Sequence, residues 1–271
     1  MFGGKMKVDH DLDQERLSST DVAIFTFYSE ISKQYDNDEI LAYVNHLIPY
    51  EMLSQFNNRN GRRSPSHQKE EYDDEESFRA IFQWFKKDFM KRMPKELQCN
   101  ICNIQMKPQL FPGTSWKLRT TEVHECMKCG SKCVFPRYSE IKKIADTRIG
   151  RCSEWSMLFG AILNSLSIPT RIVHDFLDHC WNESYIGEKW IHIDSTLDYP
   201  ISFNHPHYYE QNWNKKYEYI IAFSANSIED VTKHYTKKWN SEVLSRRIKN
   251  NTKNRIKLFN GLYSRLQTPQ Y

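Results

Sequence analysis

Apolar residues recur at helical spacing in the first part of the chain, which predicts two N-terminal helices. The first covers residues 14–31, and a Ser-Ser-Thr-Asp run near its start is typical of a helix cap. The second covers residues 39–48, and Pro49 is expected to end it. Residues 57–76 then contain almost no apolar side chains, which predicts an exposed, mobile loop.

Two further stretches show the same helical spacing. Residues 77–93, SFRAIFQWFKKDFMKRM, carry an aromatic stripe that we expect in the core, whereas Trp84 lies off this stripe and is a candidate for a cleft wall. Residues 152–166 carry apolar residues at spacings of three and four and form the most regular helix of the chain. Burial of that apolar face would hold the start of this helix rigidly.

Two later segments alternate with period two, which predicts strands. In residues 178–185, DHCWNESY, every second residue from His179 faces one side, so Cys180 faces the other. In residues 189–194, KWIHID, the alternation ends on Asp194. A glycine between the two segments indicates a hairpin.

Two Cys-x-x-Cys pairs, separated by twenty-three residues, predict a metal site. Each pair forms a tight turn that directs two thiolates at one ion, and two turns complete a tetrahedral shell. The four expected ligands are Cys99, Cys102, Cys126 and Cys129. Such a shell has no open position for water, so we expect one structural Zn²⁺ per chain. His124 and Cys133 lie nearby and are not expected to bind it.

Cys152 stands at the start of the fourth helix, where unpaired N–H groups and the helix dipole favour a thiolate. A thiol nucleophile needs a base, and a carboxylate such as Asp194 can orient an imidazole. Spacing alone leaves three candidate bases, His174, His179 and His192. Cys180 faces away from His179 and is therefore the weaker candidate nucleophile.

Composition and charge narrow the class of protein. Aromatic residues make up 14% of the chain and glycines number only 9, which suits a folded enzyme. The net charge of +4 arises from residues 233–257, which contain nine basic residues and one acidic residue, Glu242. A solvated, partly helical tail explains this surplus of positive charge better than a nucleic-acid-binding surface does. No run reaches about 18 apolar residues, so no membrane span is expected, and residues 1–30 lack a signal-peptide pattern. Seven cysteines, an odd number, favour a reducing compartment.

With these motifs identified, the sequence resembles the cytosolic peptide:N-glycanases of the transglutaminase-like superfamily. TRIGRCSEW resembles the nucleophile motif of that family, DHCW its histidine motif and WIHIDS its aspartate motif. The resemblance covers residues 77–240 and includes FQWFKKDF, the CNIC and CMKCG knuckles, FPRY, NWNKKYEYIIAFS and DVTKHYTKKW. No segment resembles the N-terminal adaptor or C-terminal mannose-binding domains of the animal members, so the chain resembles a short, fungal-type member.

The resemblance implies an α+β fold: a transglutaminase-like (papain-like) cysteine-enzyme core, an inserted Cys₄ zinc-ribbon subdomain and N-terminal helices. We divide the chain accordingly into six parts. They are an N-terminal helical region (1–56), a mobile polar loop (57–76), a core helix (77–98), the zinc-binding subdomain (99–134), the catalytic core (135–240) and a basic C-terminal tail (241–271).

The resemblance also implies roles for individual residues. The catalytic triad would be Cys152, His179 and Asp194. The cleft that binds the sugar would be lined by Arg171, Trp181, Glu183 and Trp190. Three positions depart from the family pattern, which usually has Gly, Trp and Glu at the positions of Ser153, Arg92 and Leu197. The last two lie near the active site of the family, so substrate affinity and rate depend on them.

The implied activity is deglycosylation of misfolded glycoproteins, by hydrolysis of the amide between the proximal N-acetylglucosamine and asparagine. Two alternatives stay open: another thiol acyl transferase, such as a transglutaminase or protease, and a glycan-binding pseudoenzyme. The expected partners are denatured N-glycoproteins and a ubiquitin-domain proteasome shuttle protein that docks on residues 14–31, with no nucleic acid. The expected compartment is the cytoplasm, with the nucleus as a second one.

Overall fold

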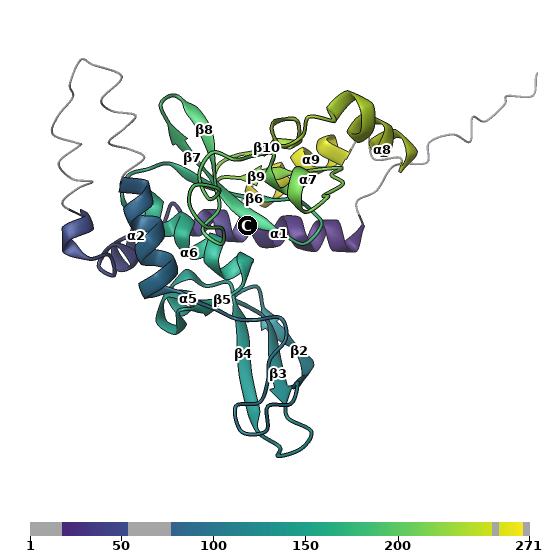
Figure 1. The fold of residues 1–271 in the computed structure, drawn as a ribbon. Helices are drawn as coiled ribbons and strands as arrows, with labels where there is room; N and C mark the ends of the chain where they lie inside the picture. The colour runs from purple at the N-terminus through teal and green to yellow at the C-terminus, as the bar shows by residue number, and fades with distance from the viewer. Residues whose placement is uncertain (1–17, 54–76, 251–254, 268–271) are drawn as a thin grey trace, which may run out of the picture.

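The computed structural model describes residues 18–53, 77–250 and 255–267. An antiparallel five-stranded sheet, in the order β10–β9–β6–β7–β8, lies at the centre of the molecule (Figure 1). Its strands are β6 (Thr170–His174), β7 (Cys180–Ile186), β8 (Lys189–Ile193), β9 (Ile221–Phe223) and β10 (Ile228–Asp230). The turn between β7 and β8 contains Gly187 at a φ of +55°, which glycine adopts without a steric penalty, and the predicted hairpin is confirmed.

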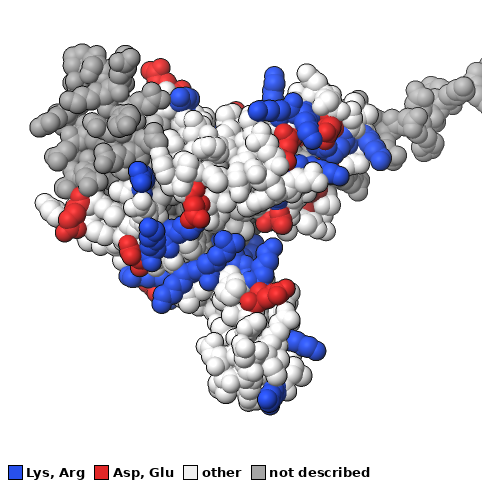
Figure 2. All heavy atoms as spheres, viewed as in Figure 1, with Lys and Arg blue, Asp and Glu red and all other residues white. Residues whose placement is uncertain are grey.

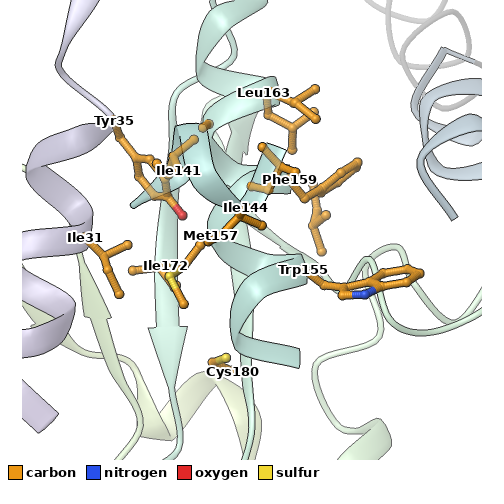
Figure 3. Close-up of a cluster of buried hydrophobic side chains, with 14 of the residues drawn as sticks. Ile31, Tyr35, Ile141, Ile144, Trp155, Met157, Phe159, Leu163, Ile172 and Cys180 are labelled. Atoms are coloured by element: carbon orange, nitrogen blue, oxygen red, sulfur yellow. The ribbon is translucent and has the colours of Figure 1, made fainter. Parts of the chain in front are cut away.

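Helices cover one face of this sheet and form the main core with it. α6 (Cys152–Ser165) packs against β6 and β7, and α1 (Ser19–Gln34) packs against β6 and β9. α2 (Asp38–Asn45) and α5 (Ile141–Thr147) pack against α6. Figure 3 shows how the apolar side chains of these elements meet, with α6 contributing the largest share.

The apolar face of α1 is used inside the chain. Ser18 caps the helix by accepting a hydrogen bond from the backbone N–H of Asp21 at 3.0 Å, and the Asp21 carboxylate accepts one in return. The apolar side chains Phe25, Tyr28 and Ile31 are all buried in the main core. The helix predicted over residues 14–31 is therefore confirmed from residue 19 onward; its earlier residues lie outside the described part of the chain.

The third predicted helix ends earlier than its apolar pattern suggests. Residues 77–84 are α-helical, and η1 (Phe85–Phe89) continues them as one π-helical turn. Beyond Met90 the chain is extended, and β1 (Lys91–Arg92) pairs in parallel with β5 (Ile149–Gly150). The prediction of a helix to residue 93 is wrong because hydrogen bonds to the strand before Cys152 replace the helical ones here.

A second antiparallel sheet projects away from the body of the molecule (Figure 1). Its strands are β2 (Lys107–Ser115), β3 (Leu118–Glu125) and β4 (Lys132–Tyr138). Together with the two Cys-x-x-Cys turns it forms what we call the arm, residues 97–138. The segment is mostly strand, and its separate core is small.

The C-terminal region packs onto the body. Its helices are α7 (Tyr208–Asn212), η2 (Thr232–Tyr235), η3 (Trp239–Val243), α8 (Leu244–Lys249) and α9 (Arg255–Gln267). Phe259 of α9 is fully buried, and its ring stacks on that of Phe25 in α1 with centroids 5.1 Å apart. Arg247 of α8 forms an ion pair with Asp230 of β10 at 2.9 Å. The helical part of the prediction is correct, and basic side chains such as Lys237, Lys238 and Lys249 are exposed, but Arg247 and Phe259 are buried against the body, so the segment is not a free tail.

The mixed helix and sheet content confirms the expected α+β class. The polar loop predicted over residues 57–76 lies outside the described residues. Among the helices that the structure describes, none combines the length and the hydropathy needed to cross a lipid bilayer.

Candidate active site

Cys152 occupies the first turn of α6, as the sequence predicted. The preceding residue, Arg151, is the helix cap, and its carbonyl accepts the N–H of Trp155 at 3.0 Å. The strand that delivers Cys152 runs very close to the helix: a Cβ on Gly150 would lie 2.3 Å from the Cβ of Glu154. Only glycine fits this approach, so the backbone before the thiol is held in one position.

His179 and Asp194 meet at the same end of the central sheet. β7 begins directly after His179 and β8 ends directly before Asp194, and their antiparallel pairing brings the two side chains together. The Nε2 atom of His179 lies 2.7 Å from Oδ2 of Asp194, and both residues are buried. His179 also lies beside Cys152: both residues line the same cavity, and each shifts the pKa of the other.

The other two candidate histidines have different partners. His192 is fully buried, with Nε2 2.6 Å from the Tyr209 hydroxyl and Nδ1 3.2 Å from the backbone N of His205. His174 accepts the N–H of Phe176 at Nδ1. Of the three, His179 is the one that lines the cavity together with Cys152 and also bonds to Asp194, so the geometry favours it as the base.

Two residues that the sequence analysis missed hold Asp194. The Tyr209 hydroxyl donates to Oδ2 at 2.8 Å, and Thr196 donates to Oδ1 from its backbone N–H at 2.8 Å and from its hydroxyl at 2.6 Å. Thr196 follows the aspartate by two residues, which is the spacing of a local side-chain turn and a usable sequence signal. Tyr209 gives no local signal because it comes from α7, a separate element.

A second aspartate shapes the loop that carries His179. Oδ1 of Asp175 accepts three backbone N–H groups, from Leu177, Asp178 and His179, at 2.9, 3.1 and 3.0 Å. Its other oxygen accepts from Lys215 at 2.8 Å. This carboxylate, itself buried, replaces the backbone partners that the loop lacks and so fixes the position of His179.

The groups of the site shift one another's pKa values. A hydrogen bond from the Cys180 side chain, followed by the hydrogen bond and charge of His179, lowers the pKa of Cys152 to about 4 against the opposing effect of burial. Burial alone lowers the pKa of His179, but Asp194 and Cys152 outweigh it and raise the pKa to about 10. Burial raises the pKa of Asp194, and His179 reverses this and holds it below its usual range. At neutral pH the site is therefore a thiolate–imidazolium pair beside an ionised carboxylate.

Cys180 is buried on the side of β7 that faces α6, opposite to Trp181, as strand alternation predicted (Figure 3). The Ser156 hydroxyl lies 2.8 Å from the carbonyl oxygen of Cys152 and 2.9 Å from that of Cys180, so it ties the first turn of α6 to β7. Burial and the Cys152 sulfur raise the pKa of Cys180, with the hydrogen bond to Cys152 as the larger cause. Cys180 is thus a neutral thiol.

An open cavity of about 400 Å³ lies in front of Cys152 and His179, within the range of small-ligand sites. Its wall includes Arg92 and Leu197, the two positions near the site at which the sequence departs from the pattern of the family it resembles. The remaining lining residues are Met93, Lys95, Arg151, Asp178, Thr196, Trp213 and Lys215. The ring of Trp213 lies edge-on to that of His179 with centroids 5.1 Å apart.

The four residues expected to bind the sugar, Arg171, Trp181, Glu183 and Trp190, are not among the residues that line this cavity. Trp181 is fully buried behind His179, and its Nε1 donates to the Tyr235 hydroxyl at 2.8 Å. Glu183 accepts from that hydroxyl at 2.7 Å and pairs with Arg171, whose guanidinium lies over the Trp190 ring. Tyr235 and other residues of the C-terminal region cover this sheet face, so Arg171, Trp181 and Glu183 form a buried network there, with Trp190 half-buried beside it.

Trp84, proposed as part of a cleft wall, is also buried. Its ring packs against that of Phe89 with centroids 4.8 Å apart. The expectation is wrong because the π-helical turn that follows Trp84 brings Phe89 beneath it.

A buried ion network joins the arm to the start of α6. Glu122 of β3 accepts two hydrogen bonds from the guanidinium of Arg151, at 2.6 and 2.7 Å. Arg137 of β4 bridges Glu122 and Glu154, at 3.1 and 2.7 Å. Glu154 in turn accepts the backbone N–H of Arg151 at 2.9 Å. Since Arg151 and Glu154 flank Cys152, the orientation of the arm and that of the nucleophile helix are linked.

The four expected metal ligands converge where β3 turns into β4, at the end of the arm's sheet opposite to Tyr138. The Sγ atoms of Cys99, Cys102, Cys126 and Cys129 all lie within 4.8 Å of one another, and those of Cys99 and Cys129 are 3.6 Å apart. Tetrahedral S₄ coordination at a metal–sulfur distance of about 2.3 Å places sulfurs about 3.8 Å apart, so the cluster fits a metal ion. His124 is not part of this group; its Nε2 lies 3.2 Å from Glu122.

Comparisons with known proteins agree with this architecture. The core model of the transglutaminase-like superfamily matches residues 116–195, and the model of the Rad4 transglutaminase-like domain matches residues 178–270. Solved structures of Rad4–Rad23, one crosslinked to undamaged DNA and one bound to a 6-4 photoproduct lesion, match with TM-scores of 0.57 and 0.56 over 92% of this chain and 53% and 54% of theirs. At 12% sequence identity these matches show a common fold alone.

Among curated proteins, peptide-N(4)-(N-acetyl-beta-glucosaminyl)asparagine amidases are similar in sequence. That of Arabidopsis thaliana is 37% identical over 196 residues, which cover 70% of this chain and 26% of the relative. That of Saccharomyces cerevisiae is 35% identical over 168 residues, covering 58% of this chain and 45% of the relative. That of Yarrowia lipolytica is 28% identical over 231 residues, covering 82% and 63%. The chain therefore spans from about a quarter to under two thirds of the length of these relatives.

Proposed function

Because the chain belongs to the peptide:N-glycanase family of transglutaminase-like proteins, we propose that it removes N-linked glycans from misfolded glycoproteins. The bond cleaved is the amide between the proximal N-acetylglucosamine and the asparagine side chain. The observation that carries the proposal is the pairing of His179 with Asp194, at 2.7 Å, beside a thiolate on a helix N-terminus. This arrangement suits nucleophilic attack on an amide carbonyl.

In the first half of the reaction, the Cys152 thiolate adds to the side-chain carbonyl carbon of asparagine. The imidazolium of His179 then donates its proton to the amide nitrogen as the C–N bond breaks. The glycosylamine leaves, and the peptide remains attached to Cys152 as a thioester. Asp194 keeps the ring oriented and stabilises its cationic form until the proton is transferred.

In the second half, neutral His179 accepts a proton from water, and the resulting hydroxide adds to the thioester carbonyl. The C–S bond breaks, the thiolate and imidazolium return, and the peptide carries aspartate in place of asparagine. The open cavity in front of Cys152 and His179 gives water access to the thioester. Both half-reactions develop an oxyanion, for which the Cys152 N–H in the first helical turn is a donor without an intrahelical acceptor.

For the four-cysteine cluster we propose Zn²⁺ as the resident ion. All four donors are cysteine sulfurs, which suit zinc, and four of them fill a tetrahedral shell. Bound there, the ion would stabilise the fold of the arm, which has only a small core of its own. Metal analysis of the purified protein should give one zinc per chain; a value well below one would count against it.

For partners and compartment we propose denatured N-glycoproteins in the cytoplasm. None of the seven cysteines, all of which lie in the described part of the chain, forms a disulfide, which suits a reducing compartment. A ubiquitin-domain shuttle protein would be a second partner. Since the apolar face of α1 is buried in the core, such a protein would have to contact the outer side of this helix, where Val22 is exposed.

The activity is tested with a denatured high-mannose glycoprotein and a gel-shift assay. Wild-type protein should convert the glycosylated band to the faster, deglycosylated one, and Cys152→Ala should not. Zinc content and the melting curve serve as controls for folding of the variant. An amine-incorporation assay on the same preparation tests the transglutaminase alternative. Equal deglycosylation by Cys152→Ala would overturn the assignment.

A further inference from the structure

The cavity in front of Cys152 has a predominantly basic wall. Four of its lining residues carry a positive charge, Arg92, Lys95, Arg151 and Lys215, and the lining residues beyond the triad include one acid, Asp178. On the face shown in Figure 2, Lys and Arg side chains gather where the arm joins the body. A cleft lined by one sign of charge attracts ligands of the opposite sign.

Two of the four cations are neutralised by carboxylates of the chain itself. Arg151 is bound by Glu122, and Lys215 is bound by Asp175 and by Asp178. The single acid in the wall, Asp178, shares Lys215 with Asp175, so these three groups together carry one negative charge, and Lys95 also acts on Asp178 through its charge. Neutralised pairs of this kind contribute little to the attraction of a charged substrate.

Arg92 and Lys95 remain exposed, and neither forms an ion pair within 4.0 Å with a residue that the structure describes. Asp194 is fully buried and paired with His179, so it is not a direct partner of either cation. On the side of the cavity that meets a substrate, Arg92 and Lys95 are therefore the two cations without a direct carboxylate partner among the described residues.

These charges are held at a fixed place relative to the nucleophile. Arg92 lies opposite Gly150 in the β1–β5 pair, two residues before Cys152. The next residue, Met93, donates its N–H to the Gly150 carbonyl at 2.9 Å. The Pro94 carbonyl accepts from the guanidinium of Arg151 at 3.2 Å, which holds the backbone just before Lys95.

We propose that this cleft selects substrates with an acidic group, a carboxylate or phosphate, close to the scissile amide. The inference rests on the proposed amidase function and adds a substrate class to it. Arg92 and Lys95 are the specificity-determining residues. The acidic group can belong to the peptide, as a residue next to the glycosylated asparagine, or to the glycan, as a phosphorylated mannose.

The test uses glycopeptides that differ in one group. Three carry the same neutral high-mannose glycan with Glu, Gln or Lys before the glycosylated asparagine, and a fourth carries Gln and a mannose phosphate. Two charges about 7 Å apart interact appreciably even in a partly solvated cleft. The Glu or phosphate substrate should therefore show a kcat/KM about three- to tenfold above that of the neutral peptide. Whichever arm shows the preference identifies the source of the acid.

The ratio of kcat/KM for the acidic substrate to that for the neutral one should fall to about two or less in the double variant Arg92→Gln/Lys95→Gln. The same ratio should fall in the wild type when salt is raised from about 0.1 M to about 1 M, because the Debye length then shrinks to about 3 Å. Lys249→Gln, an exposed charge change on α8, should retain it. Equal kcat/KM for acidic and neutral substrates in the wild type, or an unchanged ratio in the double variant, overturns the proposal.

A binding experiment separates this proposal from the amidase function. Fluorescence anisotropy of the labelled glycopeptides on the Cys152→Ala protein measures the preference without turnover. Acid preference in binding, with no glycan released by the wild type, would defeat the amidase assignment and leave the charge selectivity standing. Turnover of all substrates with no acid preference in either assay would defeat the selectivity alone.

Discussion

The ionisation state of Cys152 gives the sharpest test of the site's chemistry. The hydrogen bonds from Cys180 and His179 hold the thiol pKa at about 4, so the residue should be a thiolate throughout the neutral range. His179→Ala removes one hydrogen bond and one positive charge. The thiol pKa should then move toward the ordinary value of about 8.5, and Cys180→Ala should shift it in the same direction.

The expected change in the alkylation rate of Cys152 shows which experiment is informative. At pH 6, a pKa rise from about 4 to about 8.5 lowers the thiolate fraction by roughly 300-fold. The more basic thiolate is also the better nucleophile, by about two orders of magnitude at a Brønsted coefficient of about 0.4–0.5. These effects nearly cancel, so the alkylation rate at one pH would fall only about threefold. The pH dependence of that rate is decisive.

The assay is alkylation by iodoacetamide, followed by mass spectrometry of the peptide that contains Cys152. The wild-type rate should be flat from about pH 5.5 to 8. In His179→Ala the rate should rise with pH through this range, by up to tenfold per unit below the new pKa. A wild-type rate that rises steeply between pH 6 and 8 would refute the thiolate–imidazolium description.

The same two groups set the pH dependence of turnover. Falling pH protonates the thiolate near pH 4, and rising pH removes the imidazolium proton near pH 10. Both changes lower the rate, so kcat/KM on a small glycopeptide should form a broad plateau between these limits. A single steep rise centred near pH 8 would contradict the assignment of both groups.

Three further substitutions probe separate parts of the structure. Asp194→Asn keeps the shape but removes the charge that orients and stabilises His179, and kcat should fall roughly 10³–10⁴-fold in the glycopeptide assay. Glu122→Gln breaks the ion network that joins the arm to α6 and should lower the free energy of unfolding by about 2 kcal/mol, which corresponds to a drop in Tm of roughly 4–8 °C. The control is Glu125→Gln, which removes a solvent-accessible ion pair on the same strand and should leave Tm nearly unchanged. Phe259→Ala opens a cavity against α1 and should lower the free energy of unfolding by about 3–5 kcal/mol. The control is Asn260→Ala, at an exposed position of the same helix; if the two variants had the same Tm to within about a degree, α9 would not pack against α1.

Local sequence patterns predicted the features that depend on neighbouring residues. Apolar spacing identified the helix after Cys152, two Cys-x-x-Cys turns identified the thiol cluster, and alternation placed Cys180 opposite to His179. Each of these is fixed by a few adjacent residues. The choice of His179 among three histidines required the family resemblance, and the structure brings this ring to both Cys152 and Asp194.

Features that depend on distant segments were not predictable in this way. Alternation showed that Trp181 and Glu183 share a face, but not that Tyr235, more than fifty residues later, would bond to both. Tyr209 reaches Asp194 from another element for the same reason. The helix end near Met90 was misjudged because pairing with β5 is stronger than the local helical pattern. In each case the interacting residue lies too far away in the sequence for a local periodicity of apolar and polar residues to indicate it.

The most direct test of the central account is the chemical identity of the two products. Wild-type protein acting on a denatured N-glycopeptide should leave aspartate at the former glycosylation site and release a glycan that keeps both core N-acetylglucosamines. A peptide that retains one N-acetylglucosamine on asparagine would show cleavage of a glycosidic bond instead. That product, or a substrate left intact by the wild type, would contradict amide cleavage at Cys152.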